Sequence, residues 1–324
     1  MNNEKSFGKE INTITTDEVF NILDDDQVQL IDIRSIEAYN GWKLKGESRG
    51  GHIKNARTLP YKWLQYIDWM EIVRSKDIYP EQKIIIYGYD TGKIRKVARQ
   101  FIRAGYQEVS IYTDFIDEWS KNTSYPMDKL DRFNHLISAD WLHQLITTGE
   151  APTFTNEKYL ICHAHYQNKG DYEKGHIPNA IDLDTNLLES KETWNRRTAR
   201  ELKETLEQLG ITFDTTVILY GRFSFPNNND PFPGSSAGHL GAIRCALILL
   251  YTGVEDIRIL NGGLQSWIDE GYDITTKNYQ KKPVNNFGRT IPTHPEIIID
   301  LQEAKEYLKD VNKNLISVRR SEER

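Results

Sequence analysis

Residues 51–56 read Gly-His-Ile-Lys-Asn-Ala, and the pattern returns at residues 175–180 as Gly-His-Ile-Pro-Asn-Ala. Two further pairs of similar segments follow in the same order: residues 84–88 with 217–221, and residues 104–109 with 252–257. Each copy ends on a tryptophan, Trp119 in the first and Trp267 in the second. Matches in one order indicate an internal repeat, so we expect two related modules, at residues 10–125 and 136–275.

A third copy is expected to begin near the C-terminus. Residues 30–35 (LIDIRS) resemble residues 315–320 (LISVRR), and a stretch with helical character precedes each of them. Residues 295–324 are too few to bury a core alone. The sequence therefore predicts that they are the start of a truncated third module, and that the chain is a fragment of a longer protein.

Within each copy, segments typical of helices alternate with short apolar runs typical of buried strands. In the first copy we expect helices at residues 17–24 and 93–104 and strands at residues 28–33, 84–87 and 109–112. In the second we expect helices at residues 197–209 and 240–251 and strands at residues 160–162, 217–220 and 257–260. This alternation predicts an α/β fold in which helices flank a central parallel sheet. Polar linkers are expected at residues 122–134 and 279–295.

Ligands of open parallel sheets bind where strands end and the following helices begin. Backbone N–H groups and the helix dipole favour anions at such places. The candidate sites are therefore the loops that follow the two Tyr-Gly strand ends. Their residues are Gly88, Tyr89, Asp90, Thr91, Gly92 and Lys93 in the first copy, and Gly221, Arg222, Ser224, Ser235 and Ser236 in the second.

Composition excludes several classes of protein. The chain has 324 residues, 41 Lys and Arg against 47 Asp and Glu, a net charge of −6 and two cysteines. Mild acidity argues against a nucleic-acid partner, two cysteines cannot form a disulfide framework, and no apolar run is long enough to span a membrane. Residues 1–16 lack the apolar core of a signal peptide. We expect a cytoplasmic location for the sequence as written, and a periplasmic one if a signal peptide was removed.

The ordered motifs resemble those of the rhodanese (thiosulfate sulfurtransferase) family. The resemblance is carried by residues 30–34 (LIDIR), the two Gly-His-Ile-x-Asn-Ala motifs, the Tyr-Gly strand ends and residues 261–267 (NGGLQSW). The resemblance covers nearly the whole chain. Within the family, the chain looks most like members that contain three consecutive rhodanese modules. The resemblance implies that a cysteine thiolate takes sulfane sulfur from a small anion such as thiosulfate, or from a persulfide donor. The sulfur then passes to a thiophilic acceptor, which includes protein thiols; no cofactor is implied.

The sequence departs from the family pattern where the cysteine belongs. Gly88 and Gly221 follow the two strand ends, and neither loop contains a cysteine. The serines are no substitute, because a hydroxyl cannot form a persulfide. By analogy with the family, the catalytic cysteine is expected in the third module, beyond Arg324, and this chain alone is expected to be inactive.

The two cysteines present have simpler explanations. We align Cys162 with Asp32 on a core strand, and Cys245 lies within an apolar helix, so both are expected to be buried. The run Cys162-His163-Ala164-His165 lacks the second ligand pair of a zinc site. His52 and His176 are expected to fix their loops by hydrogen bonds. No Cys-x5-Arg loop of a phosphatase is present. Two functions remain: a sulfurtransferase with two structural modules, or a non-catalytic rhodanese-like binding or scaffold protein.

Overall fold

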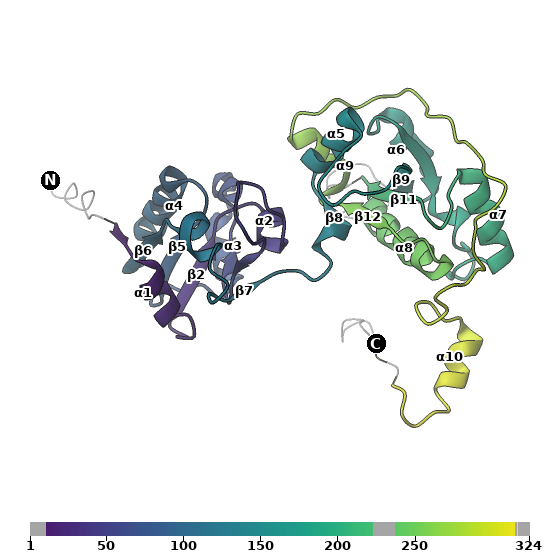
Figure 1. Cartoon of the computed structure of the whole chain (residues 1–324). Helices are drawn as coiled ribbons and strands as arrows, with labels where there is room; N and C mark the ends of the chain where they lie inside the picture. Colours follow the sequence, from purple (N-terminus) through teal and green to yellow (C-terminus); the bar gives the residue numbers. More distant parts are fainter. Residues whose placement is uncertain (1–10, 223–236, 315, 317–324) are drawn as a thin grey trace. The chain divides into compact units, whose positions relative to one another are not determined.

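The computed structural model describes residues 11–222, 237–314 and 316. The chain divides into two compact units, Met1–Asn134 and His135–Arg324, which are drawn in purple to blue and in teal to yellow in Figure 1. Each unit contains its own parallel sheet with helices on both faces. The α/β class predicted from the alternating pattern is therefore confirmed, with a separate sheet in each copy rather than one continuous sheet.

In the first unit the strand order is β1-β6-β5-β2-β4, and every pairing is parallel. Its strands are β1 (Asn12–Thr13), β2 (Val28–Asp32), β4 (Arg57–Thr58), β5 (Lys83–Tyr87) and β6 (Glu108–Tyr112), with β3 (His52–Ile53) and β7 (Met127–Asp128) as a separate antiparallel pair. Its helices are α1 (Thr16–Asn21), α2 (Ile36–Asn40), α3 (Trp69–Arg74) and α4 (Thr91–Arg103), with a 3-10 turn at Tyr61–Gln65 and a π-helical turn at Phe115–Trp119.

Alternation along the central strand builds the two core layers of this unit. Ile84 and Ile86 of β5 pack on one face, with Phe101 of α4. Ile85 and Tyr87 pack on the other, with a cluster that includes Trp119. Because successive side chains of a strand point to opposite faces, a continuous apolar run is what a sheet covered on both sides requires.

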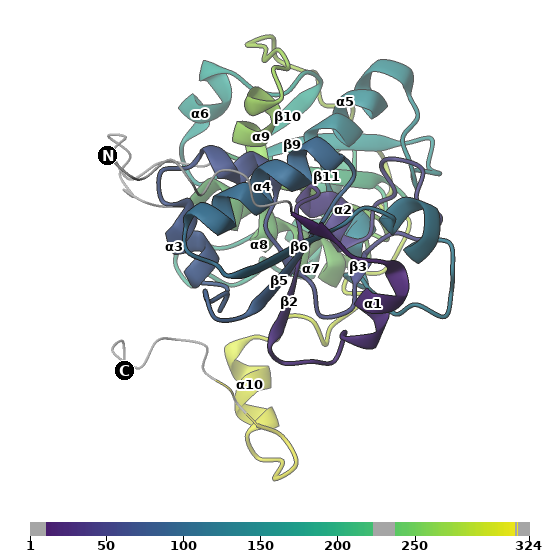
Figure 2. The same ribbon diagram turned by 90° about the vertical axis from the view of Figure 1, so that its left-hand side faces the viewer.

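In the second unit the strand order is β10-β9-β11-β12-β8, again all parallel. Its strands are β8 (Leu136–Ile137), β9 (Tyr159–His165), β10 (Ala180–Asp184), β11 (Thr216–Gly221) and β12 (Ile257–Leu260). Its helices are α5 (Ala139–Thr148), α6 (Lys169–Lys174), α7 (Ala199–Leu209), α8 (Ala237–Thr252), α9 (Gly263–Asp269) and α10 (Leu301–Tyr307), with short 3-10 turns at Phe133–His135 and Thr185–Leu187. α10 stands apart from the labelled helices of the unit in Figures 1 and 2 and buries none of its residues.

Helix ends differ from the predicted ones by a few residues because side-chain caps decide them. α1 begins at Thr16, one residue before the predicted start, because Thr15 caps it in a capping box with Glu18. α7 begins at Ala199 because Thr198 and Glu201 form another capping box. The two segments expected to be linkers both contact the folded units. In residues 122–134, β7 pairs with β3. In residues 279–295, the Phe287 carbonyl accepts a hydrogen bond from the backbone N–H of Phe213 at 3.0 Å.

Candidate functional site

In the first unit, the loop between β5 and α4 contains an aspartate that caps the helix. β5 ends at Tyr87, Gly88 is buried, and α4 begins at Thr91. The Asp90 side chain caps α4 by accepting a hydrogen bond from the backbone N–H of Lys93 at 2.7 Å. A helix N-terminus favours an anion, and here the protein supplies that anion itself.

The position expected for a nucleophile in this loop has no free space beside it. A Cβ atom built on Gly88 would lie 2.7 Å from Cγ1 of Ile33, closer than side-chain carbons approach one another. The last three residues of the candidate site, Thr91, Gly92 and Lys93, are exposed to solvent. The amine of Lys93 lies 5.2 Å from the centre of the Tyr61 ring. Gly88 therefore packs closely against Ile33, and a side chain at this position would need Ile33 to move.

A buried charge cluster lies beneath the same loop. Arg34 Nη2 donates to Asp32 at 2.6 Å and to the Gly51 carbonyl at 2.6 Å. Its Nη1 lies 3.9 Å from Glu47, and the Tyr89 hydroxyl donates to the same carboxylate. The guanidinium also lies 4.2 Å from the centre of the Phe115 ring. Tyr89 thus ties the loop to a network that is fully shielded from water.

Charge pairing outweighs burial in this cluster. Burial alone would lower the pKa of Arg34, but the adjacent Asp32 carboxylate raises it above its ordinary value. Burial raises the pKa of Glu47, and the hydrogen bonds from Tyr89 and from the backbone of Lys45 outweigh it, so that the pKa is lowered. Both groups remain charged at neutral pH. Glu47 belongs to no motif, so its position opposite Arg34 could not be predicted from the sequence.

The loop of the second unit follows Gly221, the last residue of β11. Arg222 lies 3.5 Å from Asp171 in a partly exposed ion pair. Ser224, Ser235 and Ser236 lie outside the described residues. A Cβ atom built on Gly263 would lie 2.4 Å from the Gly221 carbonyl oxygen, so the Gly-Gly turn before α9 packs directly against the end of the central strand.

The sheet register corrects the alignment of Cys162 with Asp32. Asp32 pairs with Tyr87 in the first unit, whereas His163 pairs with Tyr220 in the second. The pair Asp32 and Arg34 thus corresponds to His163 and His165. Among the residues that the structure describes, neither ring nitrogen of His163 has a hydrogen-bond partner. Burial, followed by the charge of His165, lowers the pKa of His163 to about 3, which keeps the imidazole neutral.

Neither cysteine is placed to act as a nucleophile. Cys162 and Cys245 are both buried in the core of the second unit. Burial raises the pKa of the Cys162 thiol to about 12, and burial likewise raises that of Cys245. A nucleophilic thiol needs a lowered pKa and access to substrate. Both cysteines pack as small apolar side chains.

Each Gly-His-Ile motif is held to the central strand by the tyrosine that ends that strand. The Tyr87 hydroxyl accepts from the backbone N–H of Ile53 at 3.1 Å, and the Tyr220 hydroxyl accepts from Ile177 at 2.9 Å. This contact explains why the Tyr-Gly ending and the Gly-His-Ile motif occur together in both copies.

The histidine of each motif has the hydrogen bond expected of it, and a stacked tyrosine that was not expected. Nδ1 of His52 lies 2.8 Å from the Tyr39 carbonyl, and Nδ1 of His176 lies 2.8 Å from the Tyr172 carbonyl. Each imidazole stacks on that same tyrosine, with ring centres 3.6 and 3.7 Å apart. These histidines are structural parts of the loop.

The described residues contain neither a metal-binding cluster nor a membrane-spanning helix. No group of three or more His, Cys, Asp and Glu side chains in them is arranged to hold a metal ion. No helix in the same residues combines the length and apolar character that crossing a bilayer requires.

Two parallel-sheet modules in tandem, each with a loop between its central strand and the next helix, define the class of protein. Residues 15–122 and 138–270 both match the rhodanese-like domain, and the chain belongs to the rhodanese family. It is 31% identical over 293 residues to thiosulfate sulfurtransferase YnjE of Escherichia coli, covering 89% of this chain and 62% of that protein. It is 25% identical to sulfur carrier protein TtuD of Thermus thermophilus, covering 57% of this chain and 54% of that one.

Solved structures of EanB are similar over most of the chain. The wild-type structure is 49% identical, with a TM-score of 0.89, and the match covers 94% of this chain and 71% of EanB. Another EanB structure contains ergothioneine covalently linked to a persulfide cysteine. The chain thus spans 62% and 54% of the lengths of the two curated relatives, and 71% of the length of EanB. The names of these relatives support sulfur transfer as the general activity of the family members it resembles.

Proposed function

We propose that this chain is the non-catalytic part of a rhodanese-type sulfurtransferase whose cysteine lies in a third module beyond Arg324. The observation that carries the proposal is the absence of an available thiol. Gly88 and Gly221 stand where the loops begin, and both cysteines are buried. The start of the third module is proposed at residues 295–324. The EanB structure with a persulfide cysteine supports persulfide chemistry in a similar protein.

The proposed reaction moves one sulfur atom in two steps. A cysteine thiolate attacks the outer sulfur of thiosulfate, the sulfur–sulfur bond of thiosulfate breaks, and sulfite leaves with the bonding electrons. An acceptor such as cyanide or a protein thiol then attacks the terminal sulfur of the persulfide and restores the thiolate. Neither step can occur in the two described modules, because neither presents a thiol at its loop.

The test is thiocyanate formation from thiosulfate and cyanide. We expect no turnover by this chain, none by its Cys162→Ser or Cys245→Ser variants, and turnover by a longer chain that includes the third module. Turnover by this chain that either substitution abolishes would show that the nucleophile is misplaced here. Because EanB structures contain hercynine, hercynine is a second acceptor to assay in the longer chain. An inactive longer chain would favour the binding or scaffold function.

A further inference from the structure

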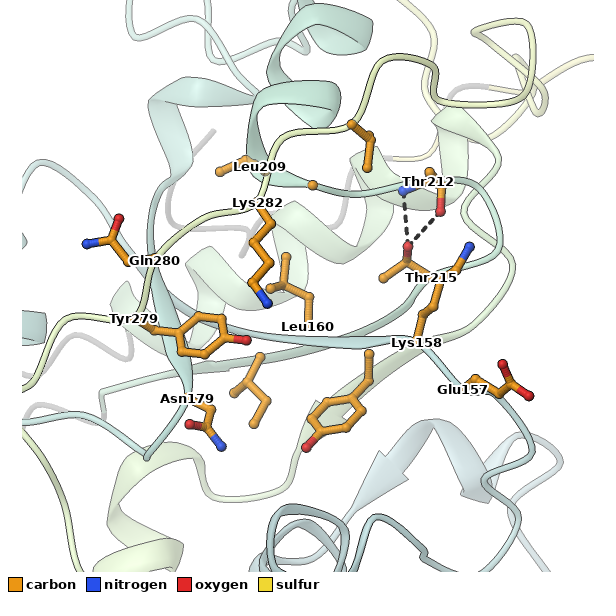
Figure 3. Close-up of a pocket in the computed structure, with 14 residues that line it drawn as sticks. Glu157, Lys158, Leu160, Asn179, Leu209, Thr212, Thr215, Tyr279, Gln280 and Lys282 are labelled. Carbon is orange, nitrogen blue, oxygen red and sulfur yellow. Dashed lines mark hydrogen bonds between the residues drawn. The ribbon is translucent and has the colours of Figure 1, made fainter.

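A hollow of about 420 Å³ lies in the second unit at the amino ends of its strands. The loop that follows Gly221 lies at the other, carboxyl end of the strands. The floor includes the first residues of β9, Leu160 and Ile161, and the end of α7 at Leu209. A segment after α9, residues 279–284, closes one side (Figure 3).

The wall formed by this segment is held in place by the rest of the unit. The Val284 N–H donates to the Glu207 carbonyl at 2.8 Å, and the Phe287 N–H donates to the Glu207 side chain at 3.0 Å. Gly210 ends α7 with a φ of 81°, and a Cβ atom there would lie 2.4 Å from the Lys282 carbonyl oxygen. Only glycine allows both the left-handed turn and this close approach, so the hollow is built into the fold.

The lining combines an apolar floor with one positive charge, that of Lys282, which has no ion-pair partner in the part of the chain that the structure describes. The amine of Lys282 and the hydroxyl of Tyr279 point toward the same space above Leu160 (Figure 3). Lys158 is paired with Asp214 at 3.4 Å. Lys282 forms no ion pair with the side chains that the structure describes. Glu157 stands at the rim with its carboxylate directed away from the centre (Figure 3).

The first unit offers a contrast at the corresponding place. Its hollow of about 570 Å³ is lined by the start of β2, the strand that corresponds to β9, and by Asn55, which corresponds to Asn179 in the second. Four carboxylates line it: Asp24, Asp25, Asp26 and Asp128. These four carboxylates outnumber the one cationic side chain of that lining, Arg57, whereas in the second hollow Lys282 has no ion-pair partner among the described residues. An anion is therefore better suited to the second hollow.

We propose that the hollow of the second unit binds a small organic anion with an apolar body. The anionic group pairs with Lys282 and accepts a hydrogen bond from Tyr279, while the apolar part covers Leu160 and Ile161. A mostly apolar concave site with a few converging polar groups is the usual form of a small-molecule site. The proposal is independent of sulfur transfer, because it concerns the other edge of the sheet.

The probe for the test is 3-phenylpropanoate, titrated into the whole chain by calorimetry, with methyl signals of Leu160 and Ile161 followed by NMR. We expect saturable binding that shifts these signals. Lys282→Gln should weaken binding about tenfold, which is the loss of about one charged contact. Lys281→Gln is the matched control, because it removes the same charge from a neighbouring exposed residue that does not line the hollow. The neutral 3-phenylpropanamide should bind at least several-fold more weakly.

Three results would overturn the proposal. Equal weakening by Lys281→Gln would mean that only the general charge of the segment matters. Equal binding of the amide would mean that no anion site exists. Absence of saturable binding at millimolar probe would mean that the hollow has no affinity for this class of ligand.

Discussion

At the level of single residues, the loop of the first module differs from a sulfurtransferase loop in more than the missing cysteine. Ile33 lies where a side chain on residue 88 would go, and Asp90 occupies the helix N-terminus. A site that merely lacked its cysteine would regain a thiol by one substitution. Here Ile33 fills the space beside Gly88, so the replacement carries a packing cost.

Gly88→Cys is therefore expected to destabilise the first unit by about 1–3 kcal/mol, the usual cost of overpacking a well-filled core. Urea unfolding would measure the change. Thr91→Cys, at an exposed position of α4, is the matched control and should change stability by less than about 0.5 kcal/mol. Combined with Ile33→Ala, Gly88→Cys should cost less than the sum of the two single changes, since the crowding is relieved. Strict additivity would contradict the crowding.

The imidazole of His163 is buried, and among the described residues neither of its ring nitrogens has a hydrogen-bond partner. Its pKa is lowered to about 3 in the folded chain, against about 6.5 when unfolded. Between these values the unfolded state binds more protons, so stability should fall as pH falls from about 6.5 toward 3. The charged groups that influence it are His165, His176, Arg222 and Asp182.

His163→Leu should flatten this part of the pH profile and raise stability at pH 5 by about 1–3 kcal/mol, since a buried polar group without a partner is removed. The measurement is thermal unfolding of the second unit between pH 4 and pH 8. His294→Leu, which changes an exposed histidine of the same unit, is the control and should leave the profile unchanged. An unaltered slope in His163→Leu would show that other groups cause the acid sensitivity.

Among the elements, the same contacts join the Gly-His-Ile loop to the central strand in both modules. The strand-ending tyrosine reaches the backbone of the Gly-His-Ile loop, and the loop histidine stacks on a second tyrosine. The first module adds a hydrogen bond of 2.9 Å from the Tyr87 hydroxyl to the buried Asp32 carboxylate. Among the described residues no carboxylate accepts a hydrogen bond from Tyr220, and His163 lies at the position that corresponds to Asp32 in the register.

We expect Tyr87→Phe to cost more than Tyr220→Phe. Each change leaves a backbone N–H without its acceptor, at about 1–3 kcal/mol, and the first also removes a donor to a buried carboxylate. Chemical denaturation and hydrogen exchange of the Ile53 and Ile177 amides would measure the effects. Tyr79→Phe, on an exposed tyrosine, serves as the control. Similar losses from Tyr87→Phe and Tyr220→Phe would show that the Asp32 contact adds nothing.

The sequence predicted the elements but not the contacts between them. Periodicity and repetition are local, so the helices, strands and paired modules could be read from apolar spacing. The register of β9 depends on its neighbour β11, and without it Cys162 was placed one residue away from its true counterpart, Ile31. Glu47 faces Arg34 across a connection without any motif. The hollow under residues 279–284 forms only when that segment packs back onto α7.

In the chain as a whole, α10 is a helix whose apolar side chains are not buried by the second unit. It has a complete capping box, formed by Asp300 and Glu303, yet it buries none of its residues. Leu308 and Val311 are 57% and 95% exposed. Arg196 links it to the second unit, 3.2 Å from Glu303 and 3.4 Å from the Ile298 carbonyl, and Ile298 packs against the core of that unit. A helix this short is not stable by itself in water, so we expect a further apolar surface to cover it.

The proposed third module would provide that surface, and Leu308→Asp tests it. In this chain the change should alter stability by less than about 0.5 kcal/mol, because the side chain is mostly in water. In a longer chain that includes the third module it should cost about 2–4 kcal/mol, because a charge would then be placed in a core. Lys309→Asp, on the neighbouring exposed residue, separates burial from the change of charge. Slowed hydrogen exchange of residues 301–307 in the longer chain would be the second measurement. If Leu308→Asp were harmless in both chains, α10 would not belong to the core of a third module.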